Sequence, residues 1–370
     1  MSDSVSPSSV TAPAEAGATG VLASRRRAGW LRQIAPLLAA LAGVFLGLLA
    51  GAVLILLSGA DPVAAYLAMF QGAFGGRRAL METVLKTTPL LLMGLGLTVA
   101  FRGQVWNIGG EGQYLMGALA GAVVGLGLQA TLPPALVIPL MLLAGLVGGA
   151  LWAAVAAFLK LRFQINEIIS TLMLNYIAEY WLLYLVRVPL KDPESFLPQS
   201  AQLARSVRLP TLGDTRIHVG FLIALALVPL VYLLLWKTPL GFRIRAIGAS
   251  QTVARYAGMS VSRGIVFALL FSGALAGLTG IMEVSALHTR LKAGILGGYG
   301  FSGILVALLG RLHPVGVLVA ALFFAALTIG AQTMHSVYGL PMALAQVIQG
   351  LVVLFVLAAD ALARRWMMTR

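Results

Sequence analysis

The stretch Ile108-Gly-Gly-Glu-Gly112 lies between two apolar runs, and Leu296-Gly-Gly-Tyr-Gly300 repeats its pattern in the second half of the chain. We call these stretches the first and the second glycine knot. Each precedes an apolar run and follows an apolar segment with clustered glycines. Unwound backbone at membrane depth is tolerated only where protein or a water-filled cavity satisfies its polar groups. The knots therefore indicate breaks between membrane helices, and they are candidates to line a solute path.

The composition around the knots is that of a polytopic helical membrane protein. The chain has 370 residues, of which 59% are hydrophobic and 10% are charged, and its mean hydropathy is +0.94. Uncharged apolar runs recur from residue 34 to residue 359, which is typical of a chain that crosses a bilayer many times. We expect about ten transmembrane helices, at residues 34–59, 84–101, 110–130, 134–159, 167–187, 217–236, 264–287, 294–310, 314–334 and 341–360.

Two of the expected spans are short. Residues 87–101 and 294–310 fall below the roughly 20 residues that cross a bilayer, so we expect broken or re-entrant segments there. Within 110–130, Gly117, Gly121 and Gly125 recur at every fourth position. This spacing favours close packing of one helix against another.

The charges are distributed as a signal of membrane topology. The formal net charge is +14, and the basic residues gather in loops between the expected spans, so they orient the chain in the bilayer rather than bind nucleic acid. Loop 237–263 has five positive residues and no negative one. We expect this loop and both termini in the cytosol, and the mixed-charge loop 190–216 on the outer, periplasmic side. We expect a disordered cytosolic tail over 1–28, because its composition buries little apolar surface, and a membrane domain over 29–370.

The expected topology gives the two knots opposite orientations. The apolar segment before the first knot runs inward and the one before the second runs outward, so the knots would relate two inverted repeats, 84–189 and 264–360. Inverted repeats are typical of transporters. The alternative is chance similarity, because glycine is common in membrane helices.

Loop 237–263 contains a candidate docking unit. Ser250 can cap a short helix that runs to Ala257, and Gly258 can supply its left-handed end. We expect this unit to contact a partner protein. The alternative is a solvated loop whose charges only set topology.

Polar side chains inside the expected spans are candidates for a solute path. Around the first knot, Trp106, Asn107, Glu111 and Gln113 offer an aromatic face, amides and a carboxylate, a set that suits a polar, uncharged solute. The alternative is that Asn107 and Glu111 cap helix ends and hydrogen-bond neighbouring helices.

A second polar group follows one face of the helix expected at 167–187. Thr171, Asn175 and Glu179 share this face, so the stripe either joins helices or lines a pathway. Further along the chain, Glu283 is likewise an acid within an apolar span, and it either lines a pathway or forms a local ion pair with the nearby His288 or Arg290.

Several classes of chemistry lack their motifs. The chain has no cysteine, and its four histidines show no metal-binding spacing. The G-x-G-x-x-G at Gly298–Gly303 follows no strand, and no G-K-[ST] closes a phosphate-binding loop. We expect no cofactor, no metal, no catalytic residue and no ATP hydrolysis by this chain, so its energy source lies elsewhere.

Four separated stretches carry a family resemblance: Asn107-Ile-Gly-Gly-Glu-Gly-Gln113, Asn166-Glu-Ile-Ile-Ser-Thr-Leu-Met-Leu-Asn175, the basic loop 237–263, and Gly297-Gly-Tyr-Gly-Phe-Ser-Gly303. Together they resemble the inner-membrane permease of bacterial ABC importers for nucleosides and simple sugars, in the branched-chain amino acid and ribose type permease superfamily. The resemblance covers about residues 34–360. It implies an all-α, ten-helix subunit of a type II importer.

The resemblance also implies partners and a solute class. A second, related permease would complete the membrane part, cytosolic ATPase subunits would drive it, and a periplasmic or lipoprotein solute-binding protein would deliver the solute. The first knot is more similar to permeases for purine and other nucleosides than to those for ribose. The alternatives are a permease for simple sugars such as ribose or galactose, and an ion-coupled secondary transporter.

The resemblance assigns roles to two sets of residues. In this family the loop that corresponds to residues 246–260 carries the helix that couples to the ATPase. The predicted contacts with the ATPase are Arg243, Arg245, Gly248, Ser250, Val253, Arg255, Tyr256 and Met259. The predicted solute-path residues are Trp106, Asn107, Glu111, Gln113, Thr171, Asn175, Tyr299 and Ser302.

Overall fold

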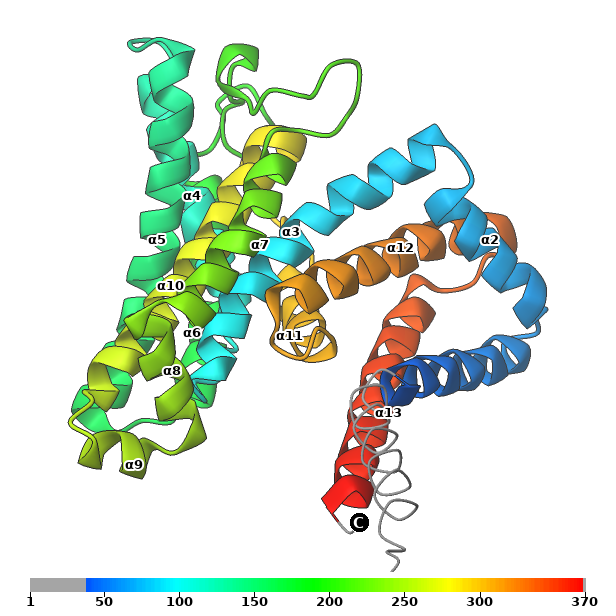
Figure 1. Ribbon diagram of the computed structural model, residues 1–370. Coiled ribbons are helices and arrows are strands. Elements are labelled where there is room, and N and C mark those ends of the chain that lie inside the picture. The colour runs from blue at the N-terminus through cyan, green and yellow to red at the C-terminus, as the bar shows by residue number, and fades with distance from the viewer. Residues whose placement is uncertain (1–37, 369–370) are drawn as a thin grey trace, which may run out of the picture. The chain divides into compact units, whose positions relative to one another are not determined.

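The computed structural model describes residues 38–368, and helices make up nearly all of its regular structure (Figure 1). Within that range the strand-like pairing is limited to two isolated bridges. Eight of the described helices are long and apolar enough to cross a membrane. The prediction of an all-α, multi-pass membrane protein is confirmed. The tail expected over residues 1–28 lies outside the described residues.

Residues 52–349 form the larger of two compact units. Its helices are α2 (Pro62–Phe74), α3 (Arg77–Arg102), α4 (Gly110–Leu128), α5 (Pro134–Phe163), α6 (Glu167–Arg187), α7 (Gly220–Lys237), α8 (Pro239–Ala249), α9 (Gln251–Tyr256), α10 (Val261–Glu283), α11 (Tyr299–Leu309) and α12 (Pro314–Tyr338). Two short helical turns accompany them, η1 (Arg205–Val207) and the π-helical η2 (Val284–His288).

The smaller unit joins the two ends of the chain. It contains residues 1–51 and 350–370, of which 38–51 and 350–368 are described. These belong to the helix Leu38–Leu57 and to α13 (Met342–Met368). The two helices touch at glycines, because a Cβ on Gly43 would lie 2.5 Å from the Cα of Val356, and one on Gly47 would lie 2.5 Å from that of Val352.

Described helices lie in all ten of the expected spans. Of the two segments that were expected to be short, 87–101 and 294–310, only the second is short. The segment 87–101 is not short, because it is the second part of α3, a helix of 26 residues. Its charged first turns, which include Glu82 and Lys86, kept this helix from being recognised at full length. By contrast, α11 has only 11 residues, as expected of a short segment. Helices α2 and α8 were not expected, and each begins with a proline after a side-chain cap, Asp61 and Thr238 respectively.

The centre of the larger unit is a close packing of α4, α5 and α10 through glycine. A Cβ on Gly117 of α4 would lie 2.1 Å from the Cα of Gly277 on α10, and one on Gly149 of α5 would lie 2.6 Å from the same atom. Small residues let helix backbones approach where lipid provides no hydrophobic drive for association. The predicted packing role of Gly117 is thereby confirmed. The first glycine knot lies at the start of α4, within this packed centre.

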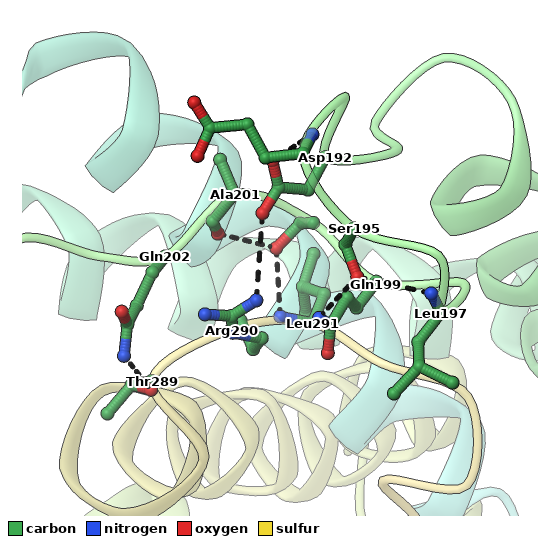
Figure 2. A network of polar contacts seen from close by, with 11 residues as sticks. Asp192, Ser195, Leu197, Gln199, Ala201, Gln202, Thr289, Arg290 and Leu291 are labelled. Carbon is green, nitrogen blue, oxygen red and sulfur yellow. Dashed lines mark hydrogen bonds and ion pairs between the residues drawn. The ribbon is translucent and has the colours of Figure 1, made fainter.

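Loop 188–219 and the α8–α9 segment lie at opposite ends of α7 (Figure 1). The loop is fastened to the segment that follows η2, as Figure 2 shows. The N–H of Ser200 donates to the carbonyl of Leu291 at 2.8 Å, and the N–H of Leu203 donates to that of Thr289 at 2.9 Å. Arg290 pairs with Asp192 of the loop at 3.6 Å. The alternative of a local ion pair between Arg290 and Glu283 is therefore wrong, because a loop distant in sequence supplies the acid.

Candidate functional site

The two glycine knots meet backbone to backbone. Helix α4 begins at Gly110 and α11 begins at Tyr299, and a Cβ on Gly110 would lie 3.0 Å from the Cα of Gly300. Glu111 Oε1 accepts a hydrogen bond from the N–H of Gly300 at 2.7 Å. A helix N-terminus carries partial positive charge and unpaired N–H groups. The carboxylate of one knot thus caps the helix that starts from the other.

Two amide side chains hold the first knot together. Asn107 Nδ2 donates to Gln113 Oε1 at 2.8 Å and to Ser272 Oγ of α10 at 2.7 Å. Asn107 Oδ1 accepts from Gln113 Nε2 at 2.9 Å and from the N–H of Gly109 at 3.0 Å. Asn107, Gln113 and Ser272 are all buried. Their polar atoms are satisfied inside the protein, which is the structural alternative that the sequence left open for Asn107.

The polar face of α6 supports the same unwound backbone. Asn175 Nδ2 donates to the carbonyl of Ile108 at 2.9 Å, and Asn175 Oδ1 accepts from the N–H of Gly112 at 2.8 Å. Thr171 Oγ1 accepts from the N–H of Ile108 at 3.1 Å. Buried backbone groups outside a helix need such partners. The first part of the predicted stripe joins α6 to the knot, whereas Glu179, further along α6, is exposed.

A second polar group links α3, α10 and α11. Lys86 Nζ donates to Tyr299 Oη at 2.7 Å, and Tyr299 Oη donates to Glu283 Oε2 at 3.0 Å. The Lys86 ammonium also lies 4.4 Å from the centroid of the Tyr299 ring. Lys86 was not among the predicted path residues, although a lysine inside an apolar helix was a usable signal. The partner of Glu283 is Tyr299 of the other knot, rather than the neighbouring His288 or Arg290 of the alternative reading.

A cavity of about 400 Å³ opens beside this second group. Among the predicted path residues, Tyr299 and Ser302 line it, and so does Lys86. Thr328 Oγ1 accepts a hydrogen bond from Gln349 Nε2 at 3.1 Å on the same lining. The predicted path residues that do not line this cavity are Trp106, Asn107, Glu111, Gln113, Thr171 and Asn175. The cavity therefore borders the second knot rather than the first.

The predicted docking unit has the expected local structure. Ser250 Oγ accepts from the N–H of Val253 at 3.3 Å and caps α9, and Gly258 follows with a φ of +73°. Ala254 is buried against α10, whereas Val253 is 67% exposed and Tyr256 is 90% exposed. The short helix thus presents an apolar and an aromatic side chain on its outer face.

The remaining predicted ATPase contacts divide between the surface and the interior. Arg243 and Arg255 are exposed. Arg245 faces its own chain, with its guanidinium 5.9 Å from the ring centroid of Trp236. Met259 packs against the buried cluster that contains Ala254.

Gly248 brings α8 against the end of α3. A Cβ at this position would lie 1.9 Å from the carbonyl oxygen of Arg102. Arg102 in turn places its guanidinium 5.2 Å from the ring centroid of Trp236, on α7. The α8–α9 segment is thus in direct contact with the helix that leads into the first knot. Over residues 38–368, no three histidine, aspartate or glutamate side chains are grouped to hold a metal ion.

The chain is similar in sequence to known transport proteins. Residues 79–357 match the family model described as branched-chain amino acid transport system / permease component. The glucose ABC transporter permease protein TsgB13 of Haloferax volcanii is 37% identical, over 90% of this chain and 88% of the relative. The guanosine ABC transporter permease protein NupP of Bacillus subtilis is 36% identical, over 90% and 96% of the two chains.

A third relative, the guanosine ABC transporter permease protein NupQ of Bacillus subtilis, is 29% identical over 65% of this chain and 78% of its own. No solved structure matches the chain. The family model covers most of the chain, including both glycine knots and the α8–α9 segment. The resemblance carried by the sequence motifs is thereby confirmed. This chain belongs to the branched-chain amino acid transport system permease family of ABC transporters.

Proposed function

We propose that this chain forms part of the solute path of an ATP-driven importer of nucleosides, with purine nucleosides as the preferred solutes. The observation that carries the proposal is the meeting of the first turns of α4 and α11, at Gly110 and Gly300, next to a cavity whose lining includes Lys86, Tyr299 and Ser302. Broken helices that meet near a solute site are a feature of transporters. The 36% identity to a guanosine permease supports the nucleoside class.

The proposal includes three kinds of partner. A cytosolic ATPase supplies the energy, a periplasmic or lipoprotein solute-binding protein delivers the solute, and a second, related permease completes the membrane part. Bacillus subtilis has two relatives named as guanosine permeases, 36% and 29% identical to this chain. The presence of two such relatives in one organism supports a heterodimer of permeases.

The proposed location is the bacterial inner membrane, with both termini in the cytosol. In this orientation loop 190–216 faces the solute-binding protein and the loop 237–263 faces the ATPase. The five positive charges of loop 237–263 support that assignment. We retain 84–189 and 264–360 as inverted repeats, because each contains one knot followed by a helix that starts there, α4 or α11.

The proposed mechanism is alternating access. Closure of the ATPase moves α9, and α8 passes that movement to α3 through the close approach of Gly248 to Arg102. Helix α3 continues into the first knot. The exposed Val253 and Tyr256 are the proposed apolar contacts with the ATPase, and Arg243 and Arg255 can pair with its acidic groups. Arg245 acts inside the permease, beside Trp236.

A permease for simple sugars is the second candidate. The 37% identity to a glucose permease favours it, and a sugar could use the same hydroxyl and amide groups of the cavity. Uptake of labelled guanosine, ribose and glucose by the complete importer in liposomes separates the two. Guanosine uptake that requires ATP supports our proposal, whereas sugar uptake without guanosine uptake would overturn it. Solute uptake driven by an ion gradient without ATP would indicate a secondary transporter instead.

A further inference from the structure

The cavity beside the second knot has a lysine ammonium group on its lining and a buried carboxyl group behind it. Lys86 and Tyr299 line the cavity, whereas Glu283 does not. Glu283 is only 2% exposed, and its Oε2 accepts a hydrogen bond from the Tyr299 hydroxyl at 3.0 Å. Lys86 donates to the same hydroxyl at 2.7 Å. We call this chain of contacts, Lys86 to Tyr299 to Glu283, the charge relay.

The Lys86 ammonium can donate further hydrogen bonds to a ligand. A lysine ammonium has three N–H donors, and within the described part of the chain its one hydrogen bond goes to Tyr299 Oη. Lys86 is half-buried, so its head is accessible from the cavity. Ser302 and Gln346 line the same cavity and add uncharged donors and acceptors. These groups together fit a solute with several hydroxyl or carbonyl groups.

In the charge relay, the positive charge of the Lys86 ammonium is balanced by the Glu283 carboxylate, so the cavity offers hydrogen-bond donors without a net charge. An isolated ammonium or carboxylate is costly inside a membrane protein, and such groups are found paired. The Tyr299 hydroxyl bridges the two groups, because it accepts a hydrogen bond from Lys86 and donates one to Glu283. Without Glu283 the cavity would carry the full charge of Lys86 and would attract anions.

We propose that Glu283 sets the charge selectivity of this cavity. Acting through Tyr299, its carboxylate neutralises Lys86, so that the cavity takes neutral, hydroxyl-bearing solutes and excludes their phosphorylated forms. Lys86 and Tyr299 contact the solute, and Glu283 is a positioning residue that does not. The inference rests on the proposed function, since it assumes that the cavity holds the transported solute.

The test compares a neutral ligand with its phosphorylated form. The assembled permeases and ATPase are placed in lipid nanodiscs without the solute-binding protein, and equilibrium binding of labelled guanosine and guanosine 5′-monophosphate is measured. In Glu283→Gln, the affinity for the monophosphate relative to guanosine should rise about tenfold or more, which corresponds to ~1.4 kcal/mol. Tyr299→Phe, which keeps the ring but removes the bridging hydroxyl, should shift the ratio in the same direction.

Two further variants separate selectivity from a general effect of charge or folding. Glu82→Gln removes a carboxylate one helical turn from Lys86, but that carboxylate pairs with Arg216 and lies outside the relay. Its ratio should match that of the unaltered protein. The double variant Lys86→Met with Glu283→Gln removes both charges and should return the ratio to near its original value. A ratio that stays unchanged in both Glu283→Gln and Tyr299→Phe overturns the inference.

A second ligand pair distinguishes failure of this inference from failure of the proposed nucleoside function. Ribose and ribose 5-phosphate are measured in the same variants. If the unaltered protein binds ribose but not guanosine, the nucleoside proposal is wrong, and a shift of the ribose ratio in Glu283→Gln still supports the charge relay. If guanosine binds and neither pair shifts in that variant, the nucleoside proposal stands and the relay is wrong. Binding of neither neutral ligand overturns both.

Discussion

Glu111 of α4 caps α11 by accepting the N–H of Gly300 at 2.7 Å, although the two residues lie in opposite halves of the chain. Both helix N-termini thus meet at one carboxylate. The other oxygen, Oε2, is buried without a hydrogen-bond partner among the described residues. The contact ties the two glycine knots together and leaves one acceptor unused.

Removal of this cap should destabilise the membrane bundle. We expect Glu111→Ala to lower the free energy of unfolding by about 2 kcal/mol or more, because a charged hydrogen bond to a buried N–H is lost. Glu111→Gln keeps a carbonyl oxygen that can accept from Gly300, so its loss should be smaller. Thermal unfolding of the purified permease in detergent measures both. Equal stability of Glu111→Ala and the unaltered protein would show that the cap contributes nothing.

The close approach of the two knots predicts a steric effect at Gly300. A Cβ at this position would lie 2.5 Å from the backbone nitrogen of Glu111. Gly300→Ala should therefore cost about 1–3 kcal/mol, the range for overpacking a buried site, and it should separate the knots and reduce uptake.

Gly127 provides the matched control, because it lies in α4 with no atom within 4 Å of an added Cβ. Gly127→Ala should be neutral or slightly stabilising, since alanine favours a helix. Unfolding temperature and guanosine uptake are measured together for both variants. Equal effects of Gly300→Ala and Gly127→Ala on stability and uptake would contradict a close approach of the two knots.

The exposed face of α9 predicts uncoupling without unfolding. Val253→Ala combined with Tyr256→Ala should leave the unfolding temperature unchanged, since both side chains are exposed. Solute-stimulated ATPase activity should fall about tenfold or more, as when central aromatic contacts of an interface are truncated. Tyr180→Ala on α6 removes a similarly exposed ring, 68% exposed, as a control. Full coupling in the double variant would exclude α9 as the ATPase contact.

Burial of His218 predicts a stability that depends on pH. Burial lowers the pKa of His218 to about 4, from its ordinary value of 6.5. Between pH 4 and pH 6.5 the unfolded chain binds a proton at this histidine that the folded protein does not bind. The contribution of His218 to the free energy of unfolding is therefore complete above pH 6.5 and is lost as the pH falls toward 4. From pH 7 to pH 5 the folded state should lose ~2 kcal/mol at this site.

Thermal unfolding at pH 7 and pH 5 checks this prediction, with His218→Gln as the variant that cannot titrate. The variant should lose less stability on acidification than the unaltered protein. An equal loss of stability in His218→Gln and the unaltered protein would show that the titrating group is a residue other than His218. Loop 188–219, which contains His218, should be the first part to become sensitive to protease at pH 5.

Much of the local structure could be predicted from the sequence, because it depends on neighbours in the chain. Apolar runs located the ten expected spans, each of which a described helix occupies at least in part. The cap at Ser250 and the left-handed Gly258 defined α9 within one residue. Hydropathy did not predict the beginning of α3, because the charged residues in its first turns lower the mean hydropathy by which a membrane span is recognised.

The sequence by itself determined that this is a helical membrane protein with two glycine knots and a short capped helix in the basic loop, since hydropathy, glycine content and capping act over a few residues. Only the tertiary structure decided the partners of its buried polar groups. Asn107 and Asn175 hydrogen-bond the first knot, Glu111 caps the second, and Glu283 reaches Lys86 through Tyr299. A buried donor or acceptor must be satisfied, but the residue that satisfies it comes from whichever helix the fold brings alongside.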